Sequence, residues 1–303
     1  MKVLVSGSTG LIGSALTPRL RTLGHDVVPL VRRRPAPGER SIGWDPEHAT
    51  IDRSALEGAD VVVHLAGENV FGRWTPAKKQ RIRDSRVLGT RLVSDAVAGL
   101  NRRPRLLLAA SAIGYYGDRG DEHLSEQSTP GEDFLAVVAR EWEAATAGAT
   151  RAGIRVVNLR FGVVLTPKTG ALAKMLPAFK LGLGGPVGSG NQYLSWISLD
   201  DALTAILHVL DTPTLSGPVN ITAPSPVTNR EFAKTLGKTL GRPAVVPVPA
   251  FALRLAFGAE GAAMLQSGQR VLPARLLESA FRFRYGTLEP ALRHLLAAPE
   301  SGR

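Results

Sequence analysis

The chain of 303 residues contains no cysteine, and this absence excludes several kinds of chemistry. Without cysteine there is no disulfide framework, no thiolate nucleophile, and no zinc or iron–sulfur site built on sulfur ligands. The six histidines show no metal-ligand spacing, so we predict no metal site. Hydrophobic residues at 44% and charged residues at 21% are ordinary values for a globular protein, which argues against global disorder.

Long hydrophobic runs are also absent. No apolar run reaches the ~18 residues that a membrane-spanning helix requires. The first five residues have the pattern of a strand and lack the long apolar core of a signal peptide. We therefore expect a soluble, cytoplasmic protein with no membrane partner.

The chain has a net charge of +11, from 37 Lys+Arg against 26 Asp+Glu. Such a charge is compatible with a nucleic-acid partner, an anionic cofactor or an arginine-rich surface. The basic residues are spread along the chain, without an aromatic-interleaved tract or a recognised nucleic-acid-binding module. We therefore expect no nucleic-acid partner.

Short apolar runs alternate with helical segments along the chain. The runs cover residues 3–5, 27–31, 60–65, 106–110, 156–159 and 219–221. Short, continuous, β-branched runs are typical of strands buried on both faces, and hence of a parallel sheet. Helical patterns cover residues 11–23, 200–210, 231–240, 250–257, 272–280 and 288–296. These patterns predict an α/β fold, a Rossmann-type doubly wound parallel sheet with helices on both faces.

The sequence changes in character after Arg160, which indicates a second, smaller unit. Residues 162–192 are rich in glycine and are expected to form loops and short helices near a ligand cleft. We predict a Rossmann domain of residues 1–165 plus 197–222, and a smaller, mostly helical C-terminal substrate domain of residues 166–196 plus 223–303. Asp200 and Asp201 are expected to cap the helix that follows them.

A glycine-rich segment, Gly7-Ser8-Thr9-Gly10-Leu11-Ile12-Gly13, follows the first predicted strand and opens the first helix. Its first glycine permits a tight turn, its second lets the backbone approach a diphosphate, and its third lets the helix pack on the sheet. The helix N-terminus offers free N–H groups to the phosphates. The alternative is an ordinary glycine-rich turn. Strand, spacing and helix together favour a dinucleotide-binding loop.

This G-x-x-G-x-x-G spacing resembles the short-chain dehydrogenase/reductase superfamily, and its extended, epimerase-like branch matches best. Further segments resemble motifs of that branch in the same order: Val62-Val63-His64-Leu65-Ala66-Gly67, Gly89-Thr90, Ser111-Ala112-Ile113-Gly114-Tyr115-Tyr116-Gly117, Leu159-Arg160-Phe161-Gly162-Val163-Val164 and Trp196-Ile197-Ser198-Leu199-Asp200-Asp201. The resemblance implies cofactor contacts from Gly7, Thr9, Gly10, Leu11, Ile12, Gly13, Leu65, Ala66, Gly67, Arg160 and Val164.

A narrower resemblance covers nearly the whole chain. Residues 64–69, 182–190, 271–275 and 281–285 are similar to segments of a small, atypical NAD(P)-dependent epimerase/dehydratase-like family with its own C-terminal domain. Members of this family are expected to bind NADP(H), and their substrates are largely undefined.

The end of the second predicted strand favours NADP(H) over NAD. An NAD-selective site places an acidic residue there to bind the ribose 2′-hydroxyl. This chain has Arg32, Arg33 and Arg34 instead, and no acidic residue before Glu39. Guanidinium groups match a 2′-phosphate in geometry and charge, so we predict that Arg32 and Arg33 bind it. Arg86 replaces the asparagine of the superfamily's N-x-x-G-T segment and is expected to bind a cofactor phosphate or a substrate anion.

The catalytic Tyr-x-x-x-Lys pair of the superfamily is absent. Depending on register, its positions hold Phe134 and Val138, or Leu135 and Ala139. Neither pair can move a proton.

Nearby oxygens are the candidate replacements: Ser111, Tyr115 and Tyr116. The phenols could face the nicotinamide, and the serine could polarise a carbonyl. The alternatives are that one tyrosine only packs and that Ser111 bonds only to backbone.

Candidate substrate contacts are Glu68, Asn191, Gln192 and Trp196. Glu68 follows the strand that lines the cofactor, and the other three lie in or after a glycine-rich loop that permits close approach of a ligand. Capping of a turn by Glu68 and a flexible hairpin at residues 184–192 are the alternatives. A polar small molecule is the expected substrate, and the helical C-terminus permits a homodimer.

Two functions follow from these patterns. The first is an NADP(H)-binding oxidoreductase or epimerase of the extended short-chain type, with a non-standard catalytic set. The second, motivated by the missing Tyr-x-x-x-Lys, is a protein that binds NADP(H) as a sensor or scaffold without turnover.

Overall fold

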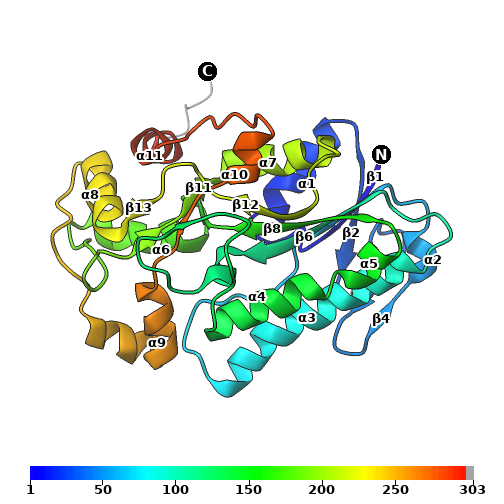
Figure 1. Cartoon of the computed structure of the whole chain (residues 1–303), viewed down its shortest axis with the longest axis horizontal. Coiled ribbons are helices and arrows are strands. Elements are labelled where there is room, and N and C mark those ends of the chain that lie inside the picture. The colour runs from blue at the N-terminus through cyan, green and yellow to red at the C-terminus, as the bar shows by residue number, and fades with distance from the viewer. Residues whose placement is uncertain (298–303) are drawn as a thin grey trace.

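The structure, a computed structural model, describes residues 1–297. An eight-stranded sheet forms its centre, in the order β12-β8-β6-β5-β1-β2-β3-β4 (Figure 1). Its strands are β1 (Lys2–Ser6), β2 (Asp26–Val31), β3 (Ile42–Asp45), β4 (Thr50–Ile51), β5 (Val61–His64), β6 (Leu106–Ala112), β8 (Arg155–Phe161) and β12 (Gly217–Ile221). Smaller pairs are β10 (Tyr193–Leu194) with β13 (Val227–Thr228), β11 (Trp196–Ser198) with β9 (Val163–Leu165), and β14 (Arg270–Val271) with β7 (His123–Leu124).

Helices connect these strands and form most of the C-terminal part. They are α1 (Gly13–Thr22), α2 (Arg53–Leu56), α3 (Pro76–Ala98), the 3-10 helix η1 (Ile113–Tyr116), α4 (Phe134–Ala144), α5 (Ala147–Arg151), α6 (Gly170–Lys180), α7 (Leu199–Asp211), α8 (Asn229–Leu240), α9 (Ala250–Gln266), α10 (Ala274–Glu278) and α11 (Leu288–Leu296). A kink at Gly258 interrupts α9. Within residues 1–297, no helix is both long and apolar enough to cross a membrane.

The central sheet has the doubly wound topology that the sequence predicts. From β1 the chain builds outward through β2 and β3, then returns to β5 and builds outward in the other direction through β6, β8 and β12. All neighbouring strands are parallel except β3 and β4. The direction of building reverses between β1 and β5, and in such sheets ligands bind at the carboxyl ends of strands at this point.

Two layers of helices cover the sheet, as Figure 1 shows: α1 and α7 lie on one face, and α3, α4 and α5 on the other. Apolar side chains of the strands alternate between the two layers. Val3 and Val5 pack into the cluster with α1 and α7, whereas Leu4 packs into the cluster that includes α3. Burial on both faces explains why these strands appear in the sequence as continuous apolar runs.

A third apolar cluster holds the smaller part together. It contains Leu172 and Phe179 of α6, Phe232 of α8 and Leu292 of α11. Helix α6 is longer than the short-helix material expected for this glycine-rich region. We propose the predicted division, residues 1–165 plus 197–222 and 166–196 plus 223–303, on the basis of this cluster. Residues 298–303 of the second unit lie outside the described residues.

The C-terminal segment is tied to the Rossmann part by buried polar contacts. Ser198 caps α7, because its Oγ accepts a hydrogen bond from the N–H of Asp201 (3.0 Å). The expected capping by Asp201 is therefore wrong. Its carboxylate instead accepts the backbone N–H groups of Arg284 (2.8 Å) and Tyr285 (2.9 Å). Asp200, also expected at the cap, pairs with His294 on the surface.

Candidate active site

The glycine-rich loop packs against the end of β5 with no room for side chains. Gly7 has a φ of +67°, and a Cβ there would lie 2.8 Å from the carbonyl carbon of Leu65. A Cβ on Gly13 would collide with the carbonyl oxygen of Gly7. Gly7 is therefore required by the tight turn, as the sequence predicts, whereas Gly13 is required by its contact with the backbone of Gly7 rather than by packing of the helix on the sheet.

The loop presents unpaired backbone donors at the start of α1. Within residues 1–297, the N–H groups of Leu11, Ile12 and Gly13 have no hydrogen-bond acceptor, whereas the N–H of Gly10 donates to the carbonyl of Gly7 (3.0 Å). Unpaired N–H groups at a helix N-terminus form a ready site for an anion. This cradle fits a dinucleotide diphosphate.

The three arginines after β2 lie in different surroundings. Arg33 forms a bidentate ion pair with Glu39, with distances of 2.6 and 2.7 Å, and the contact lowers the pKa of Glu39 to about 2. Arg32 is exposed and lines a surface cavity of about 370 Å³ together with Asp45, Pro46 and Glu47. Within the described chain, Arg32 has no ion-pair partner, so its guanidinium is available to an anion.

Arg86 lies beside the backbone that follows β5. Its guanidinium carbon would be 3.5 Å from a Cβ on Gly67, it donates to the carbonyl of Glu68 (2.9 Å), and it stacks over Trp142 at 4.9 Å. Burial lowers the pKa of Arg86 to about 10.

The Glu68 carboxylate pairs with Lys78 (2.7 Å). This contact lowers the pKa of Glu68, so Glu68 is ionised at neutral pH.

Ser111 and Arg160 share one carboxylate. The hydroxyl of Ser111 donates to Glu143 Oε1 (2.7 Å), and Arg160 makes a bidentate ion pair with the same carboxylate, at 2.7 and 2.8 Å. Burial by itself would lower the pKa of Arg160, but Glu143 and Tyr116 raise it overall. Both partners are largely buried, so Arg160 stays charged inside the protein and fixes the position of Glu143.

Tyr116 belongs to the same buried network. Its side chain is fully buried, its hydroxyl donates to Asn220 Oδ1 (2.7 Å), and it accepts from Arg160 (3.0 Å). Burial raises the pKa of Tyr116 to about 12. A phenol whose hydrogen bonds are all internal is a structural element rather than a proton donor for a ligand.

Tyr115 is differently placed. Its ring lies 3.5 Å from the guanidinium carbon of Arg160 and meets the ring of Tyr116 edge-on at 5.4 Å. The side chain is half-buried, and within residues 1–297 its hydroxyl has no hydrogen-bond partner. Of the three predicted catalytic hydroxyls, that of Tyr115 is therefore the one whose proton is not already donated within the described residues.

Helix α4 carries apolar groups where the superfamily carries its catalytic pair. Phe134 meets Trp74 edge-on at 5.5 Å, with Lys79 over its ring at 4.5 Å. Leu135 packs toward Gly114 of η1, and Val138 is buried. The acidic group that α4 does deliver is Glu143, further along the helix.

The predicted substrate contacts are not joined to this network within the described chain. Asn191 is exposed, and its backbone N–H donates to Ser189 Oγ (3.3 Å). The Gln192 amide donates to the carbonyl of Val187 (2.9 Å). Trp196 is fully buried and donates to the carbonyl of Ser225 (3.0 Å), so its indole is a core group here rather than an accessible contact.

Sequence reasoning missed Glu143 and Asn220, which complete the network. One signal for them was present: Arg160 stands in the buried, mostly apolar strand β8, and a buried arginine requires an anionic partner. The identity of that partner depends on packing between α4 and β8, which no local pattern encodes.

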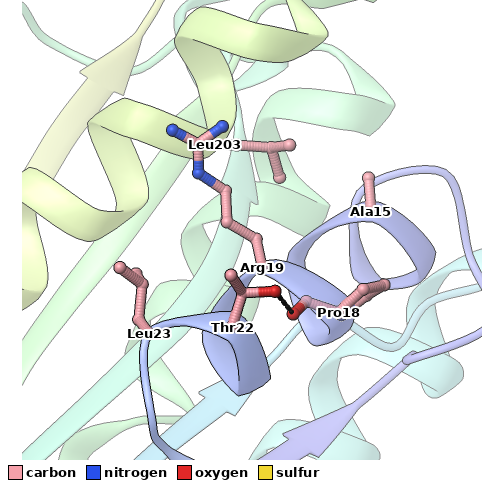
Figure 2. A pocket seen from close by; sticks show the side chains of 6 residues that line it. All are labelled: Ala15, Pro18, Arg19, Thr22, Leu23 and Leu203. Carbon is pink, nitrogen blue, oxygen red and sulfur yellow. Dashed lines mark hydrogen bonds between the residues drawn. The ribbon is translucent and has the colours of Figure 1, made fainter.

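Neither a groove beside α1 nor any metal site within residues 1–297 adds to the candidate active site. A groove of about 540 Å³ lies between α1 and α7, where the Thr22 hydroxyl donates to the Pro18 carbonyl (3.1 Å), and Figure 2 shows Arg19 and Leu203 at its sides. Its lining runs along α1 from Ala15 to Leu23 and includes no residue of the glycine-rich loop. In the described part of the chain, no group of His, Asp or Glu side chains has an arrangement that could hold a metal ion.

Comparisons with known proteins identify a family and several similar proteins. A family model for the "NAD dependent epimerase/dehydratase family" matches residues 3–222, and one for a "Domain of unknown function (DUF1731)" matches residues 248–295. The chain is 44% identical over 298 residues to Epimerase family protein MT2273 of Mycobacterium tuberculosis, covering 98% of each.

Two solved structures are similar along almost the whole chain. The human epimerase family protein SDR39U1 (isoform2), solved with NADPH, is 35% identical with a TM-score of 0.89, covering 97% of this chain and 99% of that one. A nucleoside-diphosphate sugar epimerase from Corynebacterium glutamicum is 40% identical with a TM-score of 0.79, covering 98% of this chain and 58% of that one.

Proposed function

The chain belongs to the NAD dependent epimerase/dehydratase family, and on that premise we propose that it is an NADP(H)-binding oxidoreductase or epimerase with a non-standard catalytic set. The observation that carries the proposal is the glycine-rich loop, whose unpaired N–H groups form a cradle for a diphosphate. When bound, the nicotinamide would donate or accept a hydride.

The proposed cofactor contacts follow from this cradle. Thr9, Gly10, Leu11, Ile12 and Gly13 surround the diphosphate, and Arg32 binds the 2′-phosphate. Leu65, Ala66, Gly67 and Val164 line the cleft. Arg33 contributes less to binding of the 2′-phosphate, because Glu39 already holds its guanidinium in a bidentate ion pair. The human relative solved with NADPH supports the choice of NADP(H).

Calorimetric titration with NADPH and NADH tests this assignment. We expect Arg32→Ala to weaken NADPH binding by roughly 10- to 100-fold, the value of a charge-assisted hydrogen bond, and to change NADH binding little. Arg34→Ala is the matched control in the same exposed loop and should leave both affinities unchanged. Equal losses for both nucleotides would contradict a 2′-phosphate contact.

We assign the acid–base role to Tyr115, because its hydroxyl is unpaired within the described residues while those of Ser111 and Tyr116 are engaged. Arg160, stacked on the ring, and Glu143 position it. Ser111 can still accept a hydrogen bond. The proposed substrate is a polar small molecule, for which Glu68, Asn191 and Gln192 are the remaining candidate contacts.

A second function is favoured by the apolar residues at the catalytic positions of α4. In that case the protein binds NADP(H) without turnover. Oxidation of NADPH in the presence of an aromatic dicarbonyl distinguishes the two. An enzyme is expected to consume NADPH, and Tyr115→Phe is expected to lower the rate of NADPH oxidation by roughly 100-fold or more. Tight NADPH binding without oxidation of the nicotinamide by this probe would favour the sensor. A cytoplasmic location and a homodimer stay predictions from the sequence.

A further inference from the structure

An exposed apolar patch lies at the outer end of the smaller part, where Figure 1 shows the chain running from α8 down to α9. We call it the outer patch, and it consists of Leu181, Leu183, Val245, Val246, Phe251 and Leu255. Leu181, Val245 and Leu255 are 74%, 76% and 80% exposed. Side chains of this size and exposure, gathered together, mark an interaction surface rather than an ordinary scatter of surface residues.

Backbone contacts hold the segments of the outer patch together. The N–H of Val246 donates to the carbonyl of Gly184 (3.2 Å), and the N–H of Val248 donates to the carbonyl of Pro186 (2.9 Å). Residues 181–186 therefore run beside residues 245–248, and α9 follows directly. Phe251 and Leu255 are four residues apart and share one face of that helix.

The charged residues of the two chain segments that form the outer patch are all basic, although Glu231 and Glu260 flank one of them and Lys238 pairs with Glu289. Residues 167–199 and 232–259 contain no Asp or Glu at all, and their basic residues are Lys168, Lys174, Lys180, Lys234, Lys238, Arg242 and Arg254. Lys180, Arg242 and Arg254 are exposed, and none of them takes part in an ion pair within the described residues. Two segments without a single acid are unusual in a chain that has 26 acidic residues elsewhere.

We propose that the outer patch docks onto the surface of an anionic phospholipid bilayer. Apolar side chains enter the boundary between headgroups and acyl chains, while lysine and arginine bind the lipid phosphates. A second copy of this chain fits less well, because the same positive charges would face each other. The proposal departs from the expectation of no membrane partner, which rested on the lack of a long apolar run. A surface contact needs no spanning helix, so it is compatible with the lack of one in residues 1–297.

Vesicle flotation of the full chain tests the proposal. Vesicles of equal parts phosphatidylglycerol and phosphatidylcholine are compared with vesicles of phosphatidylcholine alone, at low and high salt. We expect binding to the anionic vesicles, loss of binding at high salt, and little binding to the neutral ones. A partition coefficient that is equal for both lipid compositions would overturn the proposal.

Variants connect the binding to the outer patch. Phe251→Asp combined with Leu255→Asp should lower the partition coefficient at least tenfold, and Arg254→Gln alone roughly fivefold, the value of one cation at an anionic surface. Leu277→Asp, at a half-exposed leucine of α10 outside the outer patch, is the matched control and should bind like the unchanged chain. Melting temperatures establish that each variant is folded.

Two results would contradict the proposal even if vesicles bind. One is equal binding by the double variant and by the control, which would place the contact elsewhere. The other is concentration-dependent self-association that the double variant abolishes and that vesicles do not compete with, which would identify a second copy as the occupant. NADPH titration is independent of both results, so the proposed function stands or falls separately.

Discussion

Two adjacent tyrosines occupy opposite environments at the end of β6. The Tyr116 hydroxyl makes two internal hydrogen bonds, whereas that of Tyr115 makes none within residues 1–297. We expect Tyr116→Phe to lower the free energy of unfolding by about 1–3 kcal/mol, because Asn220 Oδ1 is left buried without a donor. Tyr115→Phe should change it by about 0.5 kcal/mol or less. Chemical denaturation measures both, and equal losses would refute the distinction.

His64 is a second residue whose surroundings give a measurable effect. It is fully buried against Trp44, its Nδ1 lies 2.7 Å from Ser6 Oγ, and burial lowers its pKa to about 4. Its place in the core makes it a packing residue rather than a base. The folded protein favours the neutral ring. The contribution of His64 to the free energy of unfolding is therefore complete above the unfolded-state pKa of about 6.5, and it falls as the pH drops toward 4.

The test compares the unchanged chain with His64→Asn, which cannot titrate. Between pH 7 and pH 5 the unchanged chain should lose about 2 kcal/mol more of its free energy of unfolding than the variant. The reason is that its unfolded state binds a proton at His64 and its folded state does not. Parallel losses in the two proteins would show that His64 is accessible to protons in the folded state.

At the scale of elements, the turn between β1 and α1 depends on a glycine at its last position. Gly13→Ala forces the loop away from Gly7, so we expect NADPH affinity to fall at least tenfold, by roughly 1.4 kcal/mol. Gly24→Ala is the matched control: it lies just beyond α1, with open space around it. It should cost some stability because its φ is +80°, but it should leave the affinity unchanged.

The elements that the sequence predicts well are those whose burial is uniform. Strands β1, β5 and β6 are buried on both faces, so apart from Lys2 and His64 their residues are apolar or small and the runs are visible. Strand β3 alternates buried Ile42 and Trp44 with half-buried Gly43 and Asp45 over only four residues, too few for a clear pattern. The glycine loop was predictable because its residues are local, whereas the Glu143–Arg160 pair joins elements that are distant in sequence.

At the scale of the whole molecule, Asp201 joins the Rossmann part to the C-terminal segment. Asp201→Ala leaves the buried Ser198 hydroxyl and the N–H groups of Arg284 and Tyr285 without an acceptor, so we expect a loss of about 2 kcal/mol or more. Asp200→Ala is the matched control, because it removes only an exposed pair with His294 and should cost about 1 kcal/mol or less. Thermal unfolding of both variants checks the difference.

Apolar contacts also join the Rossmann part to the C-terminal segment. The apolar cluster beneath α1 and α7 includes Leu276 and Phe281, and Asn220 of β12 donates to the carbonyl of Leu272 (3.0 Å). We therefore expect that the stretches that family models recognise, residues 3–222 and 248–295, do not fold as separate units. A fragment ending near residue 222 would expose part of its own core to water. In a chimaera of two members of this family, both stretches should therefore come from the same member.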